Sequence, residues 1–214
     1  MPRPRVKICG ITTNEDAILA ARLGADAIGL VFYPDSPRAI QLHQVGQIVA
    51  DLPAFTTVVG LLVDPDAAEV EAILDQGLVQ CLQFHGNETA RFCNSFGFPY
   101  IKAIRVQGLA QAEAELEQFA GHCSVLLDAF VKGTQGGTGS RFDWDIAQAL
   151  VSNSPNPVIL AGGLNAGNVG RAIAQVNPYG VDVSSGVEQC PGIKQADLMR
   201  QFFAAVQNSV NYQE

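Results

Sequence analysis

Short apolar runs rich in valine, isoleucine and leucine recur along the whole chain at intervals of roughly 20 to 30 residues. Continuous apolar runs of this length are typical of strands buried on both faces of a parallel sheet. The eight predicted strands are Val6–Cys9, Ala27–Phe32, Thr57–Val63, Val79–Phe84, Tyr100–Val106, Val125–Asp128, Pro157–Ala161 and Gly180–Ser184.

Amphipathic stretches between these runs predict helices. The clearest one opens at Asp64, which is expected to cap the helix, with Pro65 in the first helical position. An apolar stripe follows over 70–74, and Gly77 is expected to end the helix. Asn87 is likewise expected to cap a helix with an acidic first turn. The other predicted helices begin near Thr13–Asp16 or span Ala110–Phe119, Asp143–Val151, Asn165–Val176 and Gln195–Val206.

Eight β-α units predict a closed (β/α)₈ TIM barrel that takes up residues 1–214 as a single domain. About 200 residues is the lower size limit for this fold, so 214 residues leave little room for a second domain. A doubly wound open sheet is the alternative. It usually has five or six strands, and no G-x-G-x-x-G motif follows the first strand here.

The composition narrows the possible partners. The chain is 48% hydrophobic and 16% charged, which is sufficient for a substantial core. Its formal charge of −8 argues against a nucleic-acid partner, because nucleic-acid binding needs a basic face. No apolar run approaches the roughly 20 residues that a membrane helix needs, and the first strand is too short for a signal-peptide core. We therefore expect a cytoplasmic protein without a membrane partner.

Several common sites are not indicated. The cysteine count of five is odd and no C-x-x-C motif occurs, so neither a disulfide framework nor a zinc ribbon is predicted. The three histidines lie far apart, without the spacing of metal ligands. The most glycine-rich stretch, residues 132–139, lacks the G-K-[ST] ending of a P-loop. We interpret it as a mobile loop beside the site.

In a parallel barrel the carboxyl ends of the strands carry the chemistry. Lys7 and Cys9 are two residues apart and therefore share one face of the first strand. The polar residues at or beyond the strand ends are Lys7, Cys9, Arg38, Asp64, Gln83, His85, Asp128, Asp182 and Ser184.

These residues also have purely structural explanations. Cys9 has the size and polarity of a buried core residue, and His85 before a glycine suits a turn. In a closed barrel the eighth strand neighbours the first, so Asp182 would neutralise Lys7 as a buried ion pair. Asp128 is harder to explain structurally, because no helix start lies next to it to be capped.

Two glycine-containing loops predict a phosphate site. Gly162 and Gly163 end the seventh strand, and Ser184, Ser185 and Gly186 end the eighth. In many barrels the loops after these two strands, with the N-terminus of a short extra helix, bind a phosphate. Glycines let backbone N–H groups approach the phosphate oxygens. The alternative is that they only form tight turns.

Along nearly its whole length the sequence closely resembles the phosphoribosylanthranilate isomerase family. The most specific motifs are the first and the last, Lys7–Thr12 and Asp182–Glu188. The departures are minor: Phe84 stands where leucine is usual, and Gln195 where aspartate is usual. The other matching segments are Gly29–Phe32, Ser36–Arg38, Gln83–Gly86, Leu127–Asp128, Gly136–Gly139, Phe142–Trp144 and Ala161–Leu164.

The resemblance implies an Amadori rearrangement in tryptophan biosynthesis. N-(5-phosphoribosyl)anthranilate would become 1-(2-carboxyphenylamino)-1-deoxyribulose 5-phosphate, with Cys9 as general base and Asp128 as general acid. Arg38 would bind the anthranilate carboxylate, and the two glycine loops the phosphate. The reaction requires no metal, redox step or organic cofactor.

This chemistry sets physical demands on the site. Lys7 would lower the pKa of the Cys9 thiol, since nearby positive charge favours the thiolate. Asp128 must hold a proton when it acts, which burial or nearby negative charge would favour. The further substrate-binding residues are expected to be Lys7, Gln83, His85 and Asp182.

Three other functions remain possible at this point. The histidine-pathway isomerase performs the same rearrangement on a bisphosphate, but would be expected to use two aspartates and to contain two similar half-barrels. Indole-glycerol-phosphate synthase would call for a strand-end lysine as acid and an added N-terminal helix. A non-catalytic sugar-phosphate binder would not need Cys9 and Asp128 together. The sequence leaves open whether the chain is a monomer or a homodimer.

Overall fold

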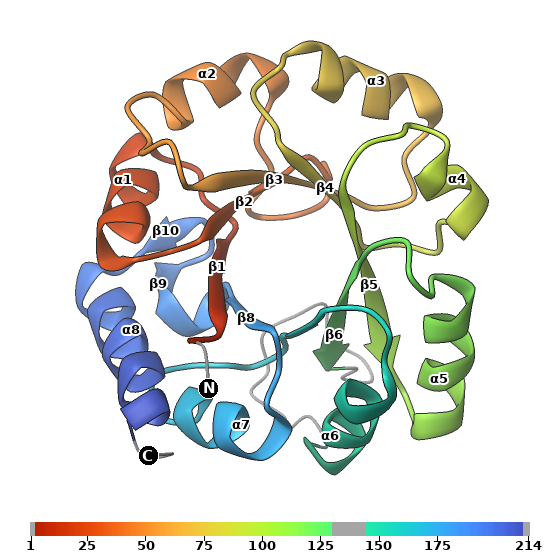
Figure 1. Ribbon diagram of the computed structural model, residues 1–214. Helices are drawn as coiled ribbons and strands as arrows, with labels where there is room; N and C mark the ends of the chain where they lie inside the picture. Colours follow the sequence, from red (N-terminus) through yellow and green to blue (C-terminus); the bar gives the residue numbers. More distant parts are fainter. Residues whose placement is uncertain (1–2, 130–143, 212–214) are drawn as a thin grey trace.

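A computed structural model describes residues 3–129 and 144–211 and forms a closed barrel of eight parallel strands in sequential order (Figure 1). The predicted fold class is therefore confirmed. The strands are β1 (Arg5–Cys9), β2 (Ala27–Val31), β3 (Thr57–Leu62), β4 (Cys81–Phe84), β5 (Tyr100–Val106), β6 (Ser124–Ala129), β7 (Val158–Leu160) and β8 (Gly180–Val183).

The barrel closes where β1 pairs with β8. In this parallel pairing Lys7 lies opposite Asp182, and on its other side Lys7 pairs with Ala27 of β2. Because parallel strands end at one edge, closure brings the carboxyl ends of β1 and β8 side by side.

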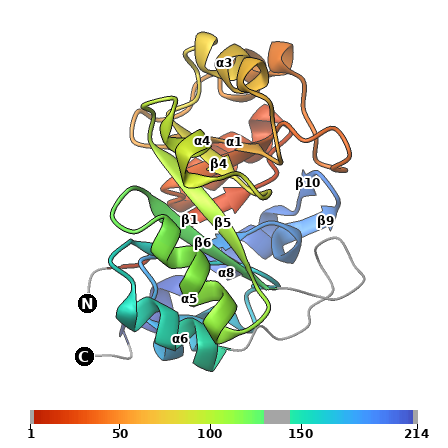
Figure 2. The same cartoon turned by 90° about the vertical axis from the view of Figure 1, so that its right-hand side faces the viewer.

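Helices form the outer ring (Figures 1 and 2). A helix of only four residues is too short to show the helical period in the sequence, so α2 was not predicted. The helices are α1 (Asn14–Leu23), α2 (Val45–Ile48), α3 (Ala67–Asp75), α4 (Ala90–Asn94), α5 (Leu109–Gln118), α6 (Trp144–Asn153), α7 (Val169–Val176) and α8 (Ala196–Asn211), with 3₁₀ turns η1 (Leu42–Gln44) and η2 (Ser185–Val187).

The start of α3 differs from the prediction. Its N-cap is Asp66, whose carboxylate accepts a hydrogen bond from the Glu69 N–H at 2.9 Å, in a reciprocal capping box. Asp64 lies outside the helix with φ of +48°. Its carboxylate instead accepts the N–H of Asn87 at 2.5 Å. Asp64 therefore fixes the loop after β4 instead of capping α3.

Two other helix starts were also predicted too early. Asn87 does not cap α4; Thr89 does, accepting the Phe92 N–H at 3.2 Å. The segment from Asn165 forms a turn, and α7 begins only at Val169.

A hairpin that the sequence analysis missed follows η2. It consists of β9 (Glu188–Cys190) and β10 (Ile193–Lys194), paired antiparallel. Figure 2 shows this hairpin at the end of the barrel away from both chain termini. The glycine-rich residues 132–139 lie outside the described residues.

The apolar core has two main parts. The larger packs between the strands and the helices, and includes Ile8, Leu82, Leu127 and Phe202. The smaller fills the barrel interior, as TIM barrels require. Its buried members are Val59, Ile101, Ala103, Leu126, Ile159 and Ala161. In the described part of the chain, no helix combines the length and the apolar character needed to cross a membrane.

A cavity of about 340 Å³ opens at the amino-terminal end of the barrel. Its lining includes the first residues of several strands, among them Arg5, Ala27, Thr57 and Gly180. The predicted catalytic residues lie at the other end of the strands, so this cavity is not the predicted site.

Candidate active site

Cys9 ends β1 and is buried, with 6% of its surface exposed. Its neighbour in the adjacent strand is Gly29, in register with it. A Cβ atom on Gly29 would lie 2.9 Å from Cys9 Sγ, so the thiol would have to shift, and 3.1 Å from Lys7 Cε, which is tighter than an ordinary contact. Gly29 therefore provides the space in which the thiol and the lysine stem sit.

Lys7 and Asp182 form the predicted ion pair across the barrel seam. Lys7 Nζ donates to Asp182 Oδ1 at 2.9 Å, and the two side chains are 4% and 9% exposed. Burial alone would lower the pKa of Lys7, but the charge and hydrogen bond of Asp182, together with Cys9, outweigh burial and raise this pKa above its ordinary value. Lys7 is thus a permanent cation, neutralised within the site.

The expectation that Cys9 has a lowered pKa is wrong. Burial raises the pKa of the thiol above its ordinary value. Lys7 and Lys194 act in the opposite direction, but they do not outweigh the loss of solvation. The physical reason is that Cys9 has lost nearly all contact with water, and that the negative charge of Asp182 counteracts the effect of Lys7 on the thiol.

Gln83, His85 and Asp128 form a chain of hydrogen bonds from β4 to β6. The Gln83 amide nitrogen lies 2.9 Å from His85 Nδ1, and His85 Nε2 lies 3.2 Å from Asp128 Oδ2. With this amide orientation, Nδ1 accepts and the Nε2 proton points to the carboxylate. The structure thus brings the predicted acid together with two predicted substrate-binding residues.

A buried ion pair supports the loop that carries His85. Lys102 Nζ donates to Glu88 Oε2 at 2.8 Å and to the Gly86 carbonyl at 2.6 Å. Glu88 also accepts the backbone N–H groups of Asp64 and Gly86. These contacts fix the backbone directly after the histidine and tie it to the loop that follows β3.

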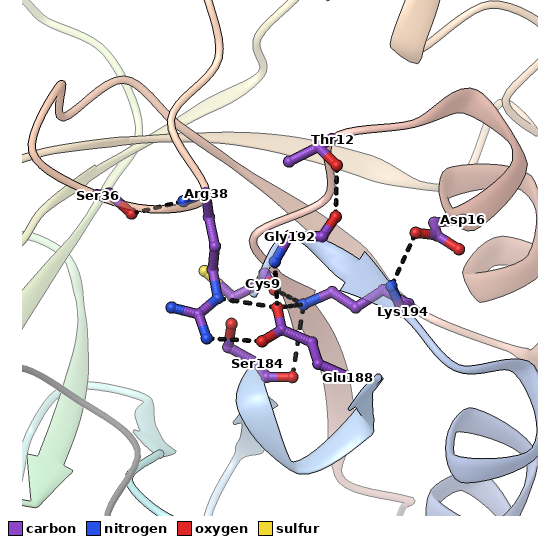
Figure 3. A network of polar contacts seen from close by, with 9 residues as sticks. All are labelled: Cys9, Thr12, Asp16, Ser36, Arg38, Ser184, Glu188, Gly192 and Lys194. Carbon is purple, nitrogen blue, oxygen red and sulfur yellow. Dashed lines mark hydrogen bonds and ion pairs between the residues drawn. The ribbon is translucent and has the colours of Figure 1, made fainter. Parts of the chain in front are cut away.

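Arg38 lies in the segment after β2, and its guanidinium is paired with Glu188 (Figure 3). Nε donates to Oε1 at 2.8 Å and Nη2 to Oε2 at 2.6 Å. Gly10, with φ of +74°, makes room for the arginine stem, because a Cβ there would collide with Arg38 Cδ. Glu188 is not among the site residues predicted from the sequence.

Lys194 is a second residue that the sequence analysis missed. Its ammonium is fully buried and donates to Glu188 Oε1 at 2.6 Å and to the Cys9 carbonyl at 2.5 Å. Burial lowers the pKa of Lys194, and the contact with Glu188 offsets this only in part. The sequence signal was an acidic residue and a lysine flanking a Pro-Gly turn beyond the eighth strand.

The two predicted phosphate loops lie against each other. Gly162 and Gly163 have φ of +81° and +66°, which favours glycine at both positions. Gly186, in η2, packs against the Leu164 carbonyl so closely that a Cβ would collide with it. Ser184 Oγ is buried and has no hydrogen-bond partner among the described residues.

The sequence over residues 6–205 matches the family model for N-(5'phosphoribosyl)anthranilate (PRA) isomerase. The chain belongs to this family. A Pseudomonas putida (strain W619) N-(5'-phosphoribosyl)anthranilate isomerase is 50% identical over 209 residues, which are 98% of this chain and 100% of the relative. The chain is thus an isomerase of tryptophan biosynthesis, which acts on phosphoribosylanthranilate by an aldose–ketose rearrangement.

Solved structures of the family have the same fold. The crystal structure of phosphoribosyl anthranilate isomerase from Thermotoga maritima has a TM-score of 0.89 at 35% identity, covering 96% of this chain and 99% of that one. Another isomerase structure, with a TM-score of 0.85 at 34% identity and the same coverage, is a complex with reduced 1-(o-carboxyphenylamino)-1-deoxyribulose 5-phosphate.

Gly29→Ala should lower turnover in this isomerase by about tenfold to a hundredfold, because the new methyl group displaces the Cys9 thiol. The measurement is kcat, with the melting temperature as a check on folding. Gly60→Ala, in the neighbouring strand β3, is the control, since its Cβ meets Phe32 and Val79 instead. Equal losses of kcat in both variants would contradict the special role of Gly29.

The stability contributed by Glu188 should depend on pH. Burial alone would raise its pKa, but the hydrogen bonds and charges of Arg38 and Lys194 hold it below the ordinary value of 4.5. A carboxyl group whose pKa is lower in the folded state than in the unfolded state stabilises the fold at pH values above its unfolded-state pKa. This contribution is lost as the pH falls through the folded-state pKa. Urea unfolding should therefore show a gap between wild type and Glu188→Gln at pH 7 that narrows below about pH 4.5. A gap independent of pH would contradict this.

Proposed function

We propose that Cys9 is the general base and Asp128 the general acid of the rearrangement. The observation that carries this assignment is the position of both residues at the carboxyl ends of barrel strands, with Asp128 held by His85 at 3.2 Å. Asp128 protonates the furanose ring oxygen, and the ring opens to an iminium ion. Cys9 removes the proton from carbon 2 of the sugar, and the resulting enolamine tautomerises to the ketone.

The base has to be a thiolate when it acts. Burial opposes this form, whereas the nearby charges of Lys7 and Lys194 favour it. These two lysines reduce, without cancelling, the cost that burial places on the thiolate. His85 orients the carboxyl group of Asp128 through its Nε2 atom.

Cys9→Ala and Asp128→Asn should each lower kcat by on the order of 10²–10⁴-fold, the usual contribution of a positioned acid or base. Conversion of enzymatically prepared phosphoribosylanthranilate to the ketose is measured by chromatography. Cys190→Ala and Asp197→Asn are matched controls on exposed side chains and should keep wild-type turnover. A Cys9 or Asp128 variant with turnover within about threefold of wild type would remove that residue from its role.

Backbone N–H groups of the loops after β7 and β8 bind the phosphate in this proposal, around Gly162, Gly163, Ser184, Ser185 and Gly186. The support is the contact between the two loops, the left-handed glycines and the unpartnered Ser184 hydroxyl. Arg38 binds the aromatic carboxylate. The five free cysteines suit a reducing compartment, which supports a cytoplasmic location.

Gly163→Ala should raise the inhibition constant of inorganic phosphate and the KM for substrate by roughly tenfold, because a side chain strains the loop that presents the N–H groups. Gly77→Ala is the control, with nearly the same φ of +65° and no atom within 4 Å of the new Cβ. It should cost stability without changing phosphate inhibition. If both variants retained the wild-type inhibition constant, the phosphate would bind elsewhere.

A further inference from the structure

Glu188 is a buried carboxylate that joins two cations from different parts of the chain (Figure 3). Its side chain is 4% exposed, and it pairs with Arg38 at 2.6 Å and with Lys194 at 2.6 Å. An exposed ion pair of this kind would contribute little. A buried ion pair is different. Moving one partner away would leave the other charge buried without compensation, which costs much free energy, so each partner holds the other in place.

The contact occupies one edge of the Arg38 guanidinium. Nε and Nη2 both donate to Glu188, in the two-pronged geometry that fixes the plane of the group. Nη1 makes no hydrogen bond within the described part of the chain, and the arginine side chain remains 20% exposed. The edge that includes Nη1 is therefore available to a ligand.

Glu188 cannot swing away easily, because Lys194 holds it from the other side. The Lys194 ammonium donates to Glu188 Oε1 and to the Cys9 carbonyl, which ends β1. The orientation of Arg38 is thus fixed relative to the backbone of the proposed base. A ligand carboxylate on Nη1 would be placed relative to that same backbone.

We propose that Glu188 is a positioning residue for carboxylate recognition: it locks Arg38 so that the Nη1 edge faces the aromatic carboxylate of the substrate. This inference rests on the proposed function of Arg38 as the carboxylate-binding residue. It predicts that removing Glu188 weakens binding of the carboxylate only when Arg38 is present, and that it leaves phosphate binding unchanged.

The experiment separates carboxylate recognition from the rest of binding. Two ligands are compared by calorimetry: reduced 1-(o-carboxyphenylamino)-1-deoxyribulose 5-phosphate and the same compound without its carboxylate. The carboxylate ratio is the Kd of the compound without the carboxylate divided by the Kd of the compound that carries it, so a high ratio means that the carboxylate contributes strongly to binding. General damage to the fold or to phosphate binding cancels in this ratio. The proteins are wild type, Glu188→Gln, Arg38→Met and the double variant, with Asp197→Asn as a control for the loss of one carboxylate.

Glu188→Gln should reduce the ratio by about tenfold, the scale of a charge-assisted hydrogen bond, and Asp197→Asn should leave it unchanged. In the Arg38→Met background Glu188→Gln should have no further effect, because its action requires the guanidinium. If Glu188→Gln fails to fold around the unpaired Lys194, the variant Glu188→Gln/Lys194→Met removes both buried charges and should show the same reduced ratio.

Three outcomes would overturn the inference: an unchanged ratio without Glu188, an increased ratio, or additive losses in the Arg38→Met background. An increased ratio would make Glu188 a competitor of the substrate carboxylate. A wild-type ratio in Arg38→Met would instead refute the carboxylate-binding role of Arg38, and with it the proposed function on which the inference rests.

Discussion

The pairing of β1 with β8 is the constraint on which the rest of the site depends. This pairing closes the barrel and puts Lys7 opposite Asp182 in a buried seam. Either charge alone would cost several kcal/mol to bury, so the register that joins them is strongly favoured. The same closure places the end of β1 beside the segment that follows β8. Lys194 can therefore reach the Cys9 carbonyl across the seam.

Most of the barrel could be predicted because its strands are buried on both faces and leave continuous apolar runs. Tyr100–Val106 matches its strand residue for residue, whereas Val79–Phe84 includes two loop residues before β4. The ion pair of Lys7 with Asp182 could also be predicted, since closure alone makes the first and eighth strands neighbours. The apolar runs carry the strand information locally, and the closed topology supplies the pairing of the first and eighth strands.

What could not be predicted depends on contacts between distant segments. Asp64 and Asp66 are both plausible caps in sequence, and only the loop after β4 decides between them by using Asp64 for the Asn87 N–H. The raised pKa of Cys9 comes from burial, which the sequence does not reveal. Glu188 is assigned no role until the hairpin beyond β8 folds back and places it against Arg38.

The charges of the site explain how an acidic chain with a formal charge of −8 can serve an anionic substrate. Lys7, Arg38 and Lys194 are each held by a carboxylate, so none is a freely moving cation. Their pairing fixes geometry and offsets the cost of burial, but it reduces their long-range attraction. In the binding mode proposed above, the phosphate depends on backbone N–H dipoles, which need no counter-charge and are held in place by the chain itself. The glycine loops and the paired cations therefore act in the same way: each would bind an anionic group through the fixed orientation of its N–H groups, without a net positive charge on the chain.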